Sequence, residues 1–73
     1  MALRKYSLKL SETAEAMKRK KVTQKVLAER MGVSPETMRR WLRGDRIPNW
    51  VQIQAMANFL DVGFNDIAEE DWS

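Results

Sequence analysis

The 73-residue sequence contains no cysteine and no histidine. Without cysteine the chain has neither a disulfide framework nor a thiolate metal site, and nothing marks it as secreted. The lack of histidine excludes an imidazole general base and a zinc site built from the usual ligands. We therefore expect no metal, no cofactor, no small-molecule ligand and no enzymatic activity.

Glycine, proline and long apolar runs are also scarce. Three glycines and two prolines leave little material for the many turns of an all-β protein. No apolar run approaches the roughly 18 residues that a membrane span needs, and no signal-peptide pattern is present. A chain of this length forms a single domain with a small core. These limits predict a small all-α domain in the cytoplasm, without a membrane partner.

Charge is divided unevenly along the chain. All 13 lysines and arginines lie between Arg4 and Arg46, where they are joined by five acidic residues, for a net charge of +8. Residues 47–73 contain five acidic residues and no basic one, for a net charge of −5. Surface charge serves solubility in any small domain, but this division favours one face built for a polyanion.

Two helices are predicted over about residues 11–20 and 24–31. Ser11 is the expected N-cap of the first and Thr23 of the second, because a side-chain oxygen there can accept a hydrogen bond from a free amide of the first turn. Gly32 follows the last apolar residue of the second helix, where glycine takes the positive φ that ends many helices.

The third predicted helix, over about residues 35–43, has a strong start signal. Ser34 is the expected N-cap, Pro35 takes the first helical position, and an acid follows in the first turn. At 100° per residue the apolar side chains share one face and the charged ones share the other. The apolar face consists of Met38, Trp41 and Leu42, and the charged face consists of Glu36, Arg39, Arg40 and Arg43.

A fourth helix is predicted from Pro48 and Asn49 to about residue 60. Asn49 together with Gln52 fits a capping box. One further turn or short helix is expected after Gly63, which gives five helical segments in all.

The chain outside these helices divides into two short ends. Residues 1–10 are a basic lead with a weak strand-like alternation over its second half. Residues 68–73 are an acidic tail, which we expect to fray unless Trp72 docks. The domain itself is expected over residues 11–67.

The second and third helices are separated by three residues, which is the spacing of a helix-turn-helix. This arrangement leaves the charged face of the third helix free. An α-helix fits the major groove of DNA, and arginine there can pair bidentately with guanine. The alternative for Glu36 and its two neighbouring arginines is an ordinary set of surface ion pairs.

The sequence also resembles a known family, the Cro and phage-repressor type of helix-turn-helix domain. The residues that carry the resemblance are Thr23, Gln24, Leu27, Ala28, Met31, Gly32, Val33, Ser34, Met38, Trp41, Gly44 and Pro48, and it continues through Ile53, Ala57, Leu60, Val62 and Ile67. The resemblance implies a compact five-helix domain that binds operator DNA as a homodimer.

Position by position, the resemblance implies which residues contact DNA. The implied positions are Gln24, Ser34, Pro35, Glu36, Thr37 and Arg40 for recognition, with Arg43 and Arg46 on the DNA backbone, and the helical wheel adds Arg39. Two departures affect this assignment. Leu42 stands where many members have a glutamate that pairs with an arginine of the first helix, and Pro35 replaces a polar residue common in the family.

A second resemblance, to the first motif of winged-helix activators and excisionases, is carried by residues 33–41. Those proteins continue into a β-wing, whereas residues 51–60 here have a helical pattern. We therefore expect a small Cro-like phage repressor that regulates transcription. The alternatives are an antitoxin or mobile-element regulator with the same domain, and a protein-interaction adaptor that does not bind DNA.

A single recognition helix reads too few base pairs to find one site in a genome. The sequence therefore predicts a homodimer on a pseudo-palindromic site of double-stranded DNA. The candidate interface residues are Trp50, Phe64 with the region from Phe59 that leads to it, and Trp72, since aromatic side chains concentrate at interfaces, although each tryptophan could also pack locally. The weak strand over residues 6–10 is the rival interface, by pairing of strand edges.

Overall fold

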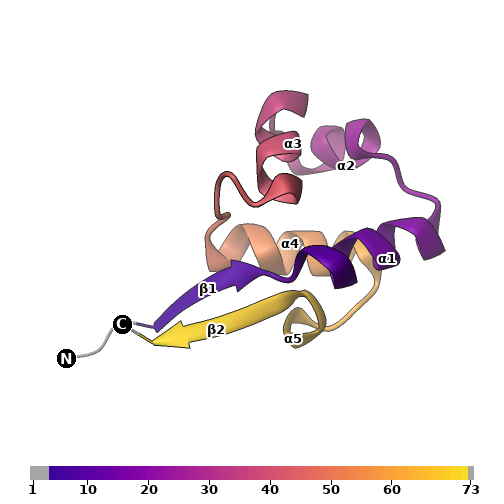
Figure 1. Ribbon diagram of the computed structural model, residues 1–73. Coiled ribbons are helices and arrows are strands. Elements are labelled where there is room, and N and C mark those ends of the chain that lie inside the picture. The colour runs from indigo at the N-terminus through magenta and orange to yellow at the C-terminus, as the bar shows by residue number, and fades with distance from the viewer. Residues whose placement is uncertain (1–3, 73) are drawn as a thin grey trace.

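A computed structural model describes the backbone of residues 4–72 and the side chains of residues 5–70 (Figure 1). The elements, in chain order, are β1 (Arg4–Leu8), α1 (Leu10–Lys20), α2 (Gln24–Met31), α3 (Pro35–Arg43), α4 (Trp50–Leu60), α5 (Phe64–Ile67) and β2 (Ala68–Trp72). The helices α2 and α3 have the predicted bounds, and the expected helical fold class with five helices is confirmed.

The predicted caps of α2, α3 and α4 are present. The side chain of Thr23 accepts a hydrogen bond from the amide of Val26, at 3.2 Å. Asn49 and Gln52 form the reciprocal capping box, with both hydrogen bonds at 2.8 Å. Gly32 ends α2 at a φ of 69°, a conformation that glycine takes without the steric cost a side chain adds. These caps fix where the helices begin and end.

The expected N-cap at Ser11 is wrong. Helix α1 begins at Leu10, and its N-cap position, Lys9, makes no side-chain capping bond. The amide of Lys9 donates to the carbonyl of Ile67, at 2.7 Å. The hydroxyl of the fully buried Thr13 donates to the carbonyl of Lys9, also at 2.7 Å. Because Lys9 is anchored at both its amide and its carbonyl, the helix starts before Ser11.

The core is built mainly by one face of each helix. Its fully buried apolar side chains are Leu27, Ala28, Met38, Ile53, Met56, Ala57 and Ile67. Helix α1 contributes Thr13, Ala16 and Met17 to the buried side. Ala28 is small enough for α2 to approach its neighbours closely, and Trp41 of α3 is only 4% exposed. The core therefore holds α3 by its apolar face.

The two ends of the chain form an antiparallel pair of strands. In β1 and β2, Tyr6 lies opposite Glu70 and Leu8 opposite Ala68. Leu8 and Ala68 are buried, and the ring of Tyr6 meets that of Phe64 edge-on, with centroids 5.1 Å apart. Residues 68–72 are therefore a paired strand rather than the frayed part of an acidic tail, because apolar contacts and strand pairing anchor them. The side chain of Trp72 lies outside the described part of the structure.

Figure 1 shows how these elements are arranged in space. The helices α2 and α3 lie together at one end of the molecule, and the β1–β2 sheet lies toward the other, with α1 and α4 between them. Helix α3 and the acidic strand β2 consequently lie toward opposite ends of the molecule.

Candidate nucleic-acid interface

The connection between α2 and α3 is a tight turn fixed by backbone hydrogen bonds. Gly32 donates to the carbonyl of Glu29, at 3.2 Å, and Val33 donates to the carbonyl of Ala28, at 3.0 Å. Val33 is half-buried and packs against the core. Ser34 then starts α3, and its side chain accepts from the amide of Thr37, at 3.1 Å. The sequence thus builds the predicted helix-turn-helix from local interactions.

Helix α3 has one buried and one exposed face, as its helical wheel predicts. Met38 and Trp41 are buried, and Leu42 is half-buried. The opposite side carries Glu36, Arg39, Arg40 and Arg43, which we call the charged face of α3. Their side chains are between 51% and 62% exposed. Three arginines are therefore exposed to solvent on a helix whose opposite face packs into the core.

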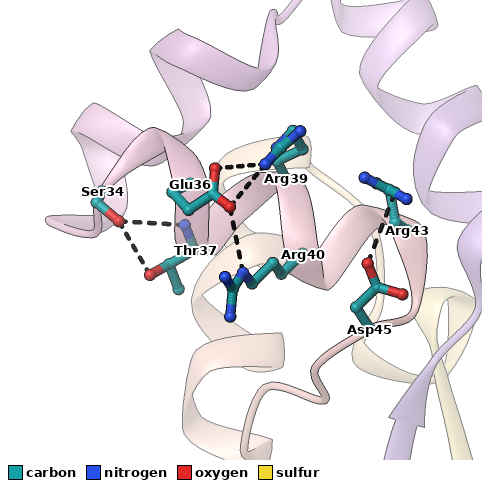
Figure 2. A network of polar contacts seen from close by, with 7 residues as sticks. All are labelled: Ser34, Glu36, Thr37, Arg39, Arg40, Arg43 and Asp45. Atoms are coloured by element: carbon teal, nitrogen blue, oxygen red, sulfur yellow. Dashed lines mark hydrogen bonds and ion pairs between the residues drawn. The ribbon is translucent and has the colours of Figure 1, made fainter.

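The charged face is an ion-paired network rather than a set of separate charges (Figure 2). Both carboxylate oxygens of Glu36 accept from Nη2 of Arg39, at 2.6 Å, and Oε1 also accepts from Nε of Arg40, at 3.2 Å. These hydrogen bonds, first with Arg39 and then with Arg40, lower the pKa of Glu36. The hydrogen bond with Glu36 raises the pKa of Arg39. The ion pairs foreseen as an alternative to DNA contacts are present in the free protein.

One acidic residue near this face was not predicted as part of it. Asp45 lies 3.6 Å from Nε of Arg43, measured to its Oδ2. Its amide donates to the carbonyl of Arg40, at 2.9 Å. Asp45 follows Gly44, whose φ of 83° ends α3, so a helical wheel drawn over the helix alone misses it. The amide of Arg46 also meets the carbonyl of Arg40, at 3.3 Å.

The remaining candidate residues lie around the start of α3 and α2. Gln24, Ser34 and Pro35 are exposed, and Thr37 is half-buried. The hydroxyl of Ser34 donates to Oγ1 of Thr37, at 3.0 Å, besides its capping role. Ser34 is therefore engaged within the protein as the cap of α3.

The uneven charge of the sequence is only partly a division in space. Nζ of Lys20 lies 3.2 Å from Oδ2 of Asp61, so a base of the first part pairs with an acid of the second. Lys5 and Lys9 belong to the sheet end of the molecule, and Nζ of Lys9 donates to the carbonyl of Asn65, at 3.3 Å.

Leu42 faces a small groove between α1 and the start of α2. The groove has a volume of about 390 Å³, and Leu10, Met17 and Val22 also line it. Where the resemblance implies a buried ion pair in many members, this chain places apolar side chains.

Two of the candidate interface residues, Trp50 and Phe64, lie in different surroundings. Trp50 is 59% exposed, and its neighbours Ile47 and Val51 are 64% and 55% exposed. Trp50 and Ile47 line a largely apolar groove of about 410 Å³, together with Lys5, Tyr6, Ser7, Pro48 and Asn49. Phe64, by contrast, is half-buried against Tyr6. Ile47 was not singled out from the sequence, because an isolated apolar residue in a connection gives no periodic signal.

Among the described residues, no group of three or more histidine, cysteine, aspartate or glutamate side chains is placed to hold a metal ion.

No helix in the described part of the structure is long and apolar enough to cross a membrane.

A helix that exposes charged residues and is set by a tight turn against its capped predecessor defines a helix-turn-helix domain. Residues 14–67 match the helix-turn-helix family, and the chain belongs to this family, of the Cro and phage-repressor type that the sequence resembles. A comparison with curated proteins finds no match.

Solved structures with this fold come from several proteins. A candidate DNA-binding protein from Bacteroides fragilis has a TM-score of 0.75 and 23% identity, over 88% of this chain and 98% of that one. The SOS-response transcriptional repressor LexA from Eubacterium rectale has a TM-score of 0.70 and 28% identity, over 78% of this chain and 61% of that one. The transcriptional regulator VanUg has a TM-score of 0.68 and 19% identity, over 94% and 91%.

Proposed function

We propose that the protein is a sequence-specific DNA-binding regulator of transcription, and more narrowly a small Cro-like repressor. The observation that carries the proposal is the charged face of α3, where three arginines are exposed on a helix whose other face is buried. A rigid helix of this kind fits the major groove. The family match and the descriptions of the similar structures support a DNA-binding regulator.

The proposed contacts divide into two kinds. Arg40 reads a base, because an arginine in the major groove can pair with O6 and N7 of guanine. Arg43 and Arg46, at the end of α3 and beyond it, contact the DNA backbone and position the helix. Further contacts to DNA are proposed for Gln24, Ser34, Pro35 and Thr37, whereas Glu36 and Arg39 form an ion pair on the same surface.

We also propose that the protein binds as a homodimer on a pseudo-palindromic operator. Two copies related by a twofold axis present two recognition helices about 34 Å apart, one turn of DNA. The exposed apolar side chains of Ile47, Trp50 and Val51 support an interface on this side of the molecule, because exposed aromatic and apolar clusters mark interaction sites. Phe64 is a weaker candidate, since its ring already packs against Tyr6.

The DNA proposal is tested by selecting binding sites from random duplexes and then measuring affinity at rising salt. We expect one preferred sequence with twofold symmetry. Arg43→Ala and Arg46→Ala should weaken all duplexes alike and reduce the salt slope by about one unit. Failure to bind any duplex would contradict the proposal and favour a protein-interaction adaptor.

The dimer is tested by sedimentation with and without the selected operator. We expect Trp50→Ala to shift the protein toward the monomer. Asn58→Ala is the control, because Asn58 is an exposed polar residue near the other end of α4. One protein copy on a non-palindromic site of half length would contradict the dimer.

A further inference from the structure

Glu36 stands among the arginines that the proposed function assigns to DNA. It lies in the first turn of α3, and its carboxylate links Arg39 to Arg40 through three hydrogen bonds (Figure 2). All three side chains are about half exposed. A negative charge therefore occupies the surface that a polyanion would approach.

The carboxylate holds the two arginines by different atoms. Arg39 donates through Nη2, which belongs to both donor edges of the planar guanidinium. Arg40 donates through Nε alone, and among the described residues nothing hydrogen-bonds to its two terminal nitrogens. Figure 2 shows these nitrogens pointing away from Glu36. A bidentate contact to guanine needs two neighbouring N–H donors. Arg40 has both terminal nitrogens available as such a pair, whereas Arg39 has no pair that leaves out Nη2.

The same arrangement affects contacts to phosphate. Binding to DNA of any sequence comes mainly from phosphates neutralised by lysine and arginine. Arg39 already has a carboxylate partner at 2.6 Å, so a phosphate must displace Glu36 or approach it against charge repulsion. An element that penalises unwanted partners raises specificity even when it lowers affinity.

We infer that Glu36 is a positioning residue that determines sequence specificity: it keeps Arg39 from phosphate and orients Arg40 toward a guanine. The inference rests on the proposed function, and it deepens that function by giving Glu36 a role in how Arg40 selects its base. Arg39 serves as the counter-ion of Glu36, although the two arginines are adjacent in the sequence.

The experiment compares the wild type with Glu36→Gln, Glu36→Asp and Glu15→Gln. Affinity is measured on the selected operator and on a scrambled duplex of equal length, over a range of salt. Glu36→Gln removes the charge, and Glu36→Asp keeps the charge but is too short to span both arginines. Glu15→Gln is the matched control, because it removes one exposed negative charge on α1, in a groove formed with α5 and the end of α4.

For Glu36→Gln we expect about three- to fivefold tighter binding of the scrambled duplex and a salt slope about one unit steeper, the effect of one added phosphate contact. The affinity for the operator should rise less, because Arg40 loses the charged hydrogen-bond partner that orients it. The ratio of operator to scrambled affinity should therefore fall at least threefold. Glu36→Asp should lower the ratio too, and Glu15→Gln should leave it unchanged.

Three results would overturn the inference. One is an equal change of both affinities in Glu36→Gln, which would make Glu36 a general surface charge. Another is a Glu36→Asp variant that keeps the wild-type ratio. The third is a loss confined to preference for one cytosine, which would mean that Glu36 reads a base itself. A wild type without any selectivity would instead contradict the proposed function, which the wild-type measurement alone reveals.

Discussion

The charged face of α3 and the β1–β2 sheet both bring acidic and basic segments together, but over different distances along the chain. On α3, Glu36 meets its partners three and four residues later in one helix. In the sheet, the basic strand β1 meets the acidic strand β2 from the opposite end of the chain. The first arrangement follows from helical geometry alone, whereas the second exists only when the whole domain has folded.

The exposed residues of the two regions also differ in how much they contribute to the stability of the fold. The sheet uses its strands to tie the two ends of the chain to the core, through the buried side chains of Leu8 and Ala68. The face of α3 is held from behind by Met38 and Trp41, so its exposed side chains contribute little to the fold. Substitutions in the sheet or on the buried face of α3 should therefore lower stability. Substitutions on the exposed face of α3 should instead lower affinity for DNA.

The largest effect is expected at the buried side of α3. Trp41→Ala should lower the free energy of unfolding by about 3–5 kcal/mol, the cost of removing a buried aromatic ring, which is enough to unfold a small domain. Trp41→Phe, which keeps a ring, is the control. Urea denaturation followed by circular dichroism measures both. A Trp41→Ala variant as stable as the wild type would contradict the expected contribution of the buried face of α3.

Arg40→Ala tests the exposed side of the same helix. It should weaken binding of the selected operator by about 1–3 kcal/mol and relax the preference at one guanine, while thermal stability stays near that of the wild type. Mobility shifts on operator variants measure this loss. Arg19→Ala, at an exposed position on α1, is the control. An equal loss on operator and random DNA would show that Arg40 contacts phosphate.

Tyr6→Ala tests the sheet. Removing the ring that packs against Phe64 should lower the free energy of unfolding by about 1–2 kcal/mol, because Tyr6 is only half-buried. Tyr6→Phe keeps the ring pair and should have little effect. Affinity for DNA, measured at a temperature where all variants are folded, should not change. Weaker DNA binding by Tyr6→Ala would show that the two regions are coupled.

The smallest expected effect is the pH dependence of the Glu36 network. The pKa of Glu36 is below its ordinary value of 4.5, first through Arg39 and then through Arg40. Its contribution to stability is therefore fully present above pH 4.5 and is lost as the pH falls through the lowered pKa. Melting temperatures of wild type and Glu36→Gln should differ slightly at pH 7 and converge at lower pH. A difference that grows on acidification would contradict this assignment.

The sequence by itself determined the helix-turn-helix and the composition of its exposed face. The caps at Thr23, Ser34 and Asn49 and the glycine that ends α2 act within a few residues, so a local pattern predicts them. The two faces of α3 follow from the 100° rotation per residue. For the same reason the ion pairs of Glu36 could be foreseen.

Only the tertiary structure decided how the two ends of the chain are used. Residues 68–72 alone are acidic and polar enough to suggest a frayed tail, and the strand β2 forms because β1 and the ring pair of Tyr6 and Phe64 are brought beside it. Another long-range contact, the hydrogen bond from the amide of Lys9 to the carbonyl of Ile67, helps to place the start of α1 ahead of Ser11. The ion pair between Lys20 and Asp61, which are 41 residues apart, likewise depends on how the chain turns in space. Local sequence patterns carry no information on such contacts, because their energy arises only when the partners meet in the folded domain.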